Sequence, residues 1–218
     1  MSTTTDIAGP PKARAHWGRF VLLALAIVVL AAIGWSTKVV KIGSSEDVAS
    51  EVFSPERFGE TEFPKIKANV EKRAVDAKTL ADAIGTDKAQ AAKQYGVAAG
   101  VGSVIPVSFT GVVGEGKSGV YEVAVDGVPA ETKIRMQTGP AINGTDLRDA
   151  TGDVKFGRFK NQIDYQNAGA GINNAMKKDA LAGIDTRNLA GKTVSVVGAF
   201  TLINPKNWLV TPVEIKVQ

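Results

Sequence analysis

The sequence predicts an α+β protein: an N-terminal transmembrane helix, a small helical layer, and then a five-stranded OB-like barrel with a helix between strands 3 and 4. Three observations predict it. An unbroken apolar run of 15 residues fills positions 20–34, helical spacing of apolar residues follows in 55–95, and alternation of period two begins at residue 105. Three strands, a helix and two strands is the order of an OB-type barrel, although a plain antiparallel sheet with a covering helix would give the same order.

The chain divides into five expected segments. They are a cytoplasmic tail (1–19), a transmembrane anchor (20–36), a tether (37–53), a helical layer (54–96) and an OB-like β domain (103–218). With 44% hydrophobic and 22% charged residues, the composition is that of an ordinary globular protein. The roughly 180 residues outside the anchor are enough for one domain with a proper core.

The apolar run has the length and flanks of a membrane anchor. No charge occurs between Arg19 and Lys38, and Trp17 and Trp35 flank the run. In a helix these two indoles lie about 27 Å apart along the axis, close to the roughly 30 Å thickness of a bilayer's hydrocarbon core. The basic residues before the run place the N-terminus in the cytoplasm and the rest of the chain outside, as a single-pass protein of the inner membrane.

A cleaved signal peptide is the competing interpretation, with Ala32-Ile33-Gly34 as a small-x-small cleavage site. The length of the apolar run and the bulky Trp35 just beyond it favour a retained anchor. Both interpretations export the C-terminal part of the chain to the periplasm or outside.

Helix signals fill the segment after the tether. Ser54-Pro55 is typical of a helix start, with serine as the cap and proline in the first turn. Thr86-Asp87 is a second candidate cap, and Gly96 is a candidate stop. Apolar residues recur at helical spacing between these signals, at Ile66, Val70 and Ala74 and again at Leu80 and Ile84.

Strand signals fill most of the remainder. Alternation predicts strands around 105–113, 121–125, 134–136, 194–196 and 213–217, with a short additional strand around Val154 and Phe156. Residues 139–152 are rich in glycine, asparagine and proline and are expected to form a loop. A helix is expected over residues 161–181.

Several kinds of chemistry are excluded by composition. The chain has no cysteine, and its one histidine, His16, precedes the apolar run, so thiol nucleophiles, Ser-His-Asp catalysis and the usual zinc sites have no ligands in the domain. Of 26 basic and 22 acidic residues, three basic and one acidic precede the run, which leaves 23 against 21. This near-neutral domain lacks the basic excess of a nucleic-acid binder. We therefore expect no cofactor, no metal and no catalytic residue.

The stretch from Gly111 to Ser118 matches the pattern of a phosphate-binding P-loop, with Gly116-Lys117-Ser118 at its end. Such a loop needs a following helix whose N-terminus receives the phosphate. Here an alternating segment from Gly119 to Val125 follows instead. We interpret the stretch as a hairpin turn between two strands.

The C-terminal half also carries spaced motifs that resemble a known family. They are Gly144-Thr145-Asp146-Leu147-Arg148-Asp149-Ala150, Phe159-x-Asn161-Gln162-Ile163-x-Tyr165, Leu189-x-Gly191-Lys192 and Thr211-Pro212-Val213. This pattern resembles the bacterial predicted periplasmic lipoproteins grouped as domain of unknown function 2291, over nearly everything after residue 36. The resemblance implies no established activity. Since family members are often encoded beside sugar ABC transporters, it implies an accessory role in uptake by association only.

One departure from the family concerns the anchor. Where its members usually carry a lipid-modified cysteine, this chain has Trp35-Ser36-Thr37 before Lys38-Val39-Val40. The acylation site is missing, so we expect a transmembrane helix to do its work.

Five polar residues are the candidate ligand- or partner-binding site: Arg148, Asp149, Asn161, Gln162 and Tyr165. Arginine donates, aspartate accepts and the amides do both, which suits a hydroxyl-rich solute or a polar protein surface such as a transporter component. The structural alternative is that Arg148 and Asp149 bond within their own loop, while Asn161 caps the helix and Gln162 faces solvent. A second functional hypothesis is a carboxylate-dependent enzyme acting on carbohydrate through Asp146 and Asp149.

Overall fold

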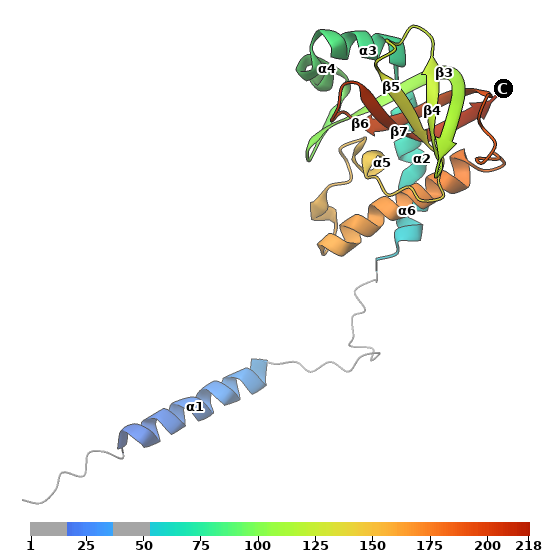
Figure 1. Cartoon of the computed structure of the whole chain (residues 1–218). Helices are drawn as coiled ribbons and strands as arrows, with labels where there is room; N and C mark the ends of the chain where they lie inside the picture. Colours follow the sequence, from blue (N-terminus) through green and yellow to red (C-terminus); the bar gives the residue numbers. More distant parts are fainter. Residues whose placement is uncertain (1–16, 37–52) are drawn as a thin grey trace, which may run out of the picture. The chain divides into compact units, whose positions relative to one another are not determined.

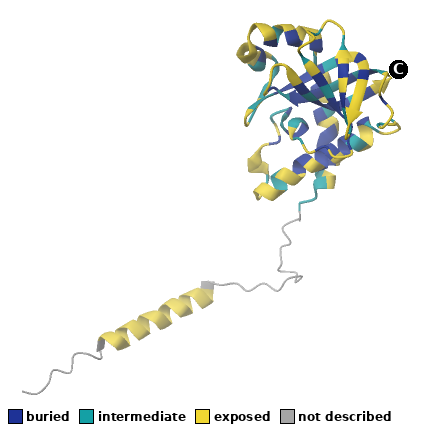
Figure 2. Ribbon diagram, viewed as in Figure 1, coloured by how far each residue is buried: buried dark blue, intermediate teal, exposed yellow. Residues whose placement is uncertain are grey.

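The computed structural model describes residues 17–36 and 53–218, which fall in two separate units (Figure 1). In the first unit, α1 (Trp17–Ser36) begins three residues before the expected anchor. Its 20 residues span about 30 Å at 1.5 Å per residue. By length and composition α1 could cross a membrane, and its described side chains are exposed (Figure 2). The expected tail up to residue 16 and the tether over 37–52 lie outside the described residues.

The second unit, residues 53–218, contains the expected helices, together with a short helix inside the expected loop 139–152 and a 3-10 turn. The expected helices are α2 (Pro55–Arg73), α3 (Ala77–Thr86), α4 (Lys88–Tyr95) and α6 (Gln162–Ala180); the short helix is α5 (Asp146–Asp149), and the 3-10 turn is η1 (Phe156–Arg158). The predicted caps are confirmed at two of these helices. The Ser54 hydroxyl accepts a hydrogen bond from the Arg57 amide, and the Asp87 carboxylate accepts from the amides of Ala89 and Gln90.

Seven strands form one sheet. They are β1 (Val75–Asp76), β2 (Val97–Ala99), β3 (Gly102–Lys117), β4 (Val120–Val125), β5 (Lys133–Gln137), β6 (Thr193–Thr201) and β7 (Asn207–Val217). The pairings β3–β4, β4–β5, β5–β7, β7–β6 and β6–β3 close into a ring, in which only β5–β7 is parallel. The predicted order of three strands, a helix and two strands is present in β3–β5, α6 and β6–β7.

The predicted number of five strands is wrong, because β1 and β2 also join the sheet. β3 is 16 residues long, and β6 pairs with its residues from Val104 to Val112 along one edge. Along the other edge β4 covers only the second half, so β2 and β1 pair with the first half. Strands of two and three residues are too short to show an alternating pattern in the sequence.

Two further strand predictions have different outcomes. The prediction of a short strand around Val154 and Phe156 is wrong: Val154 is buried in a bend, and Phe156 begins η1. The hairpin interpretation of the P-loop pattern is confirmed. β3 continues to Lys117, Ser118 and Gly119 turn with φ of 54° and 78°, and β4 follows without a helix.

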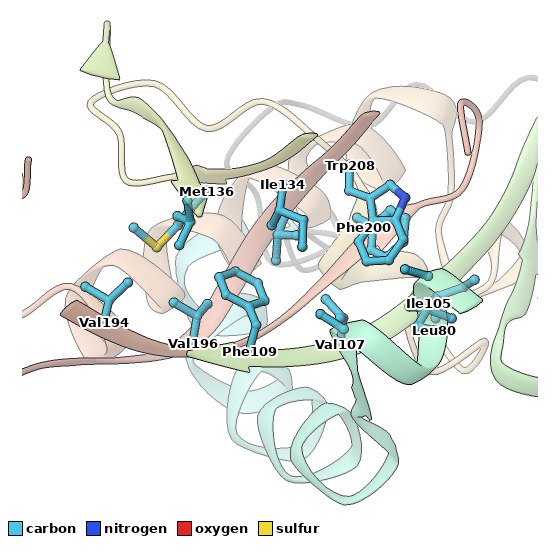
Figure 3. Close-up of a cluster of buried hydrophobic side chains, with 14 of the residues drawn as sticks. Leu80, Ile105, Val107, Phe109, Ile134, Met136, Val194, Val196, Phe200 and Trp208 are labelled. Carbon is cyan, nitrogen blue, oxygen red and sulfur yellow. The ribbon is translucent and has the colours of Figure 1, made fainter. Parts of the chain in front are cut away.

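Apolar side chains from all five ring strands meet inside the ring. Figure 3 shows Phe109, Ile134, Val196 and Trp208 pointing toward one another, with Leu80 of α3 closing one end. The Trp208 indole stacks on the Phe200 ring at 4.8 Å between centroids. A second buried cluster lies between α2, α6 and the outside of the sheet.

The helices α2 and α6 cross with their backbones in contact. A Cβ added at Gly59 would collide with the carbonyl of Gly171, and one at Gly171 would collide with the carbonyl of Pro55. Glycine at both positions therefore permits this crossing. The crossing places the middle of α6 against the first turns of α2. The short helix α5 packs against α6.

Candidate functional site

A cavity of about 760 Å³ opens beside α5. Its walls come from the β2–β3 connection, the loop that leads into α5, the segment up to η1, the first turn of α6 and the ends of β6 and β7. The residues on which the argument depends are Val101, Asp146, Arg148, Asp149, Tyr165 and Ile203. The volume lies within the range of about 300–1,000 Å³ typical of small-molecule sites.

Arg148 and Asp149 form a bidentate ion pair on the cavity wall. Nε of Arg148 donates to Oδ1 of Asp149 at 2.8 Å, and Nη2 donates to Oδ2 at 3.0 Å. The arginine side chain is only 9% exposed and the aspartate side chain 16%. A planar guanidinium suits this two-point contact, which fixes both side chains in orientation.

Tyr165 also contacts the Arg148 guanidinium, through its ring and its backbone carbonyl. The Arg148 Cζ lies 3.7 Å from the centroid of the tyrosine ring, and its Nη1 donates to the Tyr165 carbonyl at 3.4 Å. Burial, followed by the nearby Asp149 charge, raises the pKa of the Tyr165 hydroxyl. The phenol thus stays protonated and able to donate at neutral pH. Through these contacts α5 and α6 are joined at the cavity.

Asp146 is a second carboxyl on the same wall and lies deeper. The hydroxyl of Thr201 donates to its Oδ1, and that of Thr211 donates to its Oδ2 at 3.2 Å. Gln137 extends this hydrogen-bond network, because its side-chain amide donates to the Thr211 hydroxyl at 3.0 Å. Burial raises the pKa of Asp146, against the lowering effect of the two threonine hydrogen bonds, and the Asp149 charge raises it further.

The structure brings together three of the five predicted site residues. Arg148, Asp149 and Tyr165 line the cavity, whereas Asn161 and Gln162 are not among its lining residues. Asn161 caps α6, because its Oδ1 accepts from the Asp164 amide at 2.8 Å. Gln162 is exposed as the first residue of α6.

Sequence reasoning missed Thr201, Thr211 and the apolar rim of the cavity. One signal was present: Thr211 interrupts the apolar run from Trp208 to Val213 in β7, and a polar side chain buried there needs a partner. Val101 and Ile203 carried no such signal. Across residues 17–36 and 53–218, no group of three or more His, Cys, Asp or Glu side chains is placed to hold a metal ion.

Comparisons with known proteins agree with this architecture. The sequence profile of a family described as predicted periplasmic lipoprotein, DUF2291, matches residues 25–216. A crystal structure of an OB-fold protein from Thermotoga maritima superposes with a TM-score of 0.61 at 19% sequence identity, covering 77% of this chain and all of the other. At that identity the likeness shows the fold alone. No curated protein matches the chain.

Proposed function

Since the chain belongs to the DUF2291 family of predicted periplasmic lipoproteins, we propose that it is a membrane-anchored extracytoplasmic binding module whose cavity takes a small polar solute. Membership makes it an extracytoplasmic, membrane-associated protein. We further propose that α1 retains the chain in the inner membrane as a single-pass protein, and that the closed ring of five strands is an OB-type barrel. The apolar composition of α1, the absence of cysteine and the solved OB-fold structure support these two proposals.

The cavity beside α5 is the observation that carries the binding function. Its wall combines an arginine fixed in orientation by Asp149 with a protonated phenol and a deep carboxyl, while Val101 and Ile203 supply apolar rim. Such a mixture of donors, acceptors and apolar surface suits a solute that carries hydroxyl groups on an apolar frame. A sugar fits that description, which agrees with the uptake role that the family resemblance implies, and a sugar ABC transporter component is the protein partner to test.

Binding can be tested with the detergent-solubilised full chain and a panel of neutral sugars, polyols and amino acids. A solute present at ten times its Kd should raise the free energy of unfolding by about 1.4 kcal/mol. Ala98→Trp should abolish this effect, because residue 98 is an exposed cavity residue and an indole there fills the opening. Ala130→Trp, at an exposed turn position, is the matched control. Stabilisation by no solute, or by one that Ala98→Trp leaves unaffected, would contradict the proposal.

A carboxylate-dependent enzyme is the second candidate, favoured by one observation. Asp146 and Asp149 line the same cavity in different surroundings: burial raises the pKa of Asp146, whereas Asp149 is held by Arg148. Two carboxyls in different surroundings are what glycoside hydrolysis uses. Turnover of nitrophenyl glycosides that is lost in both Asp146→Asn and Asp149→Asn would favour the enzyme. Binding without turnover favours the module.

A further inference from the structure

We propose that the segment from Lys155 to Ile163, here called the basic aromatic loop, docks on the surface of a bilayer that contains anionic phospholipid. The loop comprises η1 and the residues up to the first turn of α6. This inference rests on the proposed retention of α1, which tethers the folded unit to a membrane.

The loop exposes large apolar side chains. Phe156 is 51% exposed and Ile163 67%. Within the folded unit, the other exposed large hydrophobic residues are Val101, Val112, Ile203 and Val217, so the loop concentrates two in nine positions. Exposed aromatic and aliphatic side chains close together in sequence are typical of segments that lie at the level of lipid headgroups.

The same loop is basic. Lys155, Arg158 and Lys160 lie within it, and no acidic residue occurs between Asp153 and Asp164. Neither lysine has an ion-pair partner in the described part of the chain, and both are exposed. Arg158 contacts Glu62 at 3.3 Å but is still 43% exposed, and the Asp164 carboxylate is engaged by the Asn161 amide. Anionic lipid attracts such clusters, and apolar side chains between the cations add burial.

The aromatic rings of the loop pack against other rings of the folded unit. The Phe159 ring lies 5.4 Å from Phe53, 5.4 Å from Phe58 and 5.3 Å from Tyr165, and Phe156 meets Tyr165 edge-on at 5.7 Å. A loop packed in this way presents its apolar side chains at a smaller cost of ordering them on binding.

The point where the chain enters the folded unit favours a bilayer as the occupant. Phe53, its first described residue, packs directly on Phe159. The tether from the membrane therefore ends at the loop itself. Residues 37–52 span about 55 Å at most when fully extended, so the loop stays at high effective concentration near the lipid surface. Phe156 also lines the cavity, so docking sets the cavity mouth beside the headgroups.

Site-specific fluorescence on the full chain tests the docking. The chain has no cysteine, so a single Ile163→Cys substitution accepts an environment-sensitive fluorophore at one place. Val112→Cys is the control, because Val112 on β3 is comparably exposed at 49%. The protein is reconstituted in vesicles of phosphatidylcholine alone or mixed with an equal amount of phosphatidylglycerol. Washing the vesicles with carbonate leaves only anchored molecules for measurement.

Docking predicts that a fluorophore at residue 163 emits at shorter wavelength and is quenched by headgroup-labelled lipid, and that both changes require phosphatidylglycerol. A fluorophore at residue 112 should show neither change. Adding Lys155→Gln and Lys160→Gln should lower the docked-to-free ratio about fivefold for each cation removed. Lys117→Gln with Lys206→Gln, which removes equal charge elsewhere, should not. Equal quenching at residues 163 and 112, or burial of residue 163 only in native membranes with their proteins, would overturn the proposal. Loss of the chain in the carbonate wash would instead refute retention of α1.

Discussion

Replacing Arg148 with alanine should destabilise the folded unit strongly, because it leaves the carboxylate of Asp149 largely buried without its partner. Removing one member of a buried ion pair costs about 3–5 kcal/mol. The side chains here are 9% and 16% exposed, which places the loss near the lower end of that range. The contact with the Tyr165 ring at 3.7 Å adds about 1 kcal/mol. We expect a total loss of about 4 kcal/mol in the free energy of unfolding.

A double-mutant cycle isolates the pair from the rest of the cavity wall. Arg148→Ala with Asp149→Ala removes both charges, so no orphan carboxylate remains. The double variant should be more stable than the sum of the two single losses predicts, by about 2 kcal/mol. Urea unfolding can be followed by fluorescence of Trp208, which is fully buried. Trp17 and Trp35 are first replaced by phenylalanine, so that Trp208 is the only tryptophan of the three that remains.

The reasoning fails if Arg148→Ala changes the free energy of unfolding by no more than about 0.5 kcal/mol, the range of an ordinary surface substitution. A loss of that size is expected for an arginine that serves only to bind a ligand and sits on a flexible loop. Strict additivity of the two single losses would also contradict the account, since it would mean that the two side chains do not interact in solution.

Four further predictions test other parts of the account. Membranes should retain the full-length chain through a carbonate wash, and a soluble product beginning at Trp35 would contradict this. Lys117→Ala should change the free energy of unfolding by less than about 0.5 kcal/mol; saturable ATP binding that it abolishes would restore the P-loop interpretation. Gly171→Ala should lower the free energy of unfolding by about 2–3 kcal/mol, because the new Cβ collides with the α2 backbone. Gly85→Ala, whose Cβ meets open space in α3, should raise it by up to about 1 kcal/mol. Similar effects of the two substitutions would show that the helix crossing is loose. Burial raises the pKa of Asp146 above its ordinary 3.8, so the bound proton stabilises the fold fully below that pH, and this stabilisation is lost as pH rises through the raised value. In urea unfolding, Asp146→Asn should therefore gain stability relative to the wild type as pH rises above 3.8. A difference that stays constant with pH would contradict the burial.

The elements with local chemical signals could be predicted from the sequence. Ser54 and Asp87 cap helices because their side-chain oxygens bond amides two or three residues ahead, a rule that needs no tertiary context. The order of the long strands followed from alternation over several residues. β1 and β2 could not be predicted, because their existence depends on an edge of β3 that β4 leaves uncovered, which is a property of the assembled sheet.

The candidate site was predictable only where its chemistry is concentrated in short segments. Arg148 and Asp149 stand out as adjacent opposite charges, and Tyr165 follows within one loop and one helical turn. Their convergence depends on how α5 packs on α6, which spacing alone does not fix. The contact of Asp146 with Thr201 and Thr211 joins residues 55 and 65 positions apart and needs the register of β6 and β7. Asn161 was misleading, since the same side chain serves a ligand or a helix cap equally well in sequence.

Methyl NMR of the folded unit, within the full chain in detergent, tests the central claim that the cavity beside α5 binds a solute. With alanine, isoleucine, leucine and valine methyls labelled, a binding solute should shift the signals of Ala99, Val101, Ile203 and Leu209, which line the cavity. Val112 is an exposed methyl outside it and should not move. The account predicts shifts confined to the cavity methyls and abolished by Ala98→Trp. Shifts centred elsewhere, or none with any member of the sugar, polyol and amino-acid panel, would contradict it.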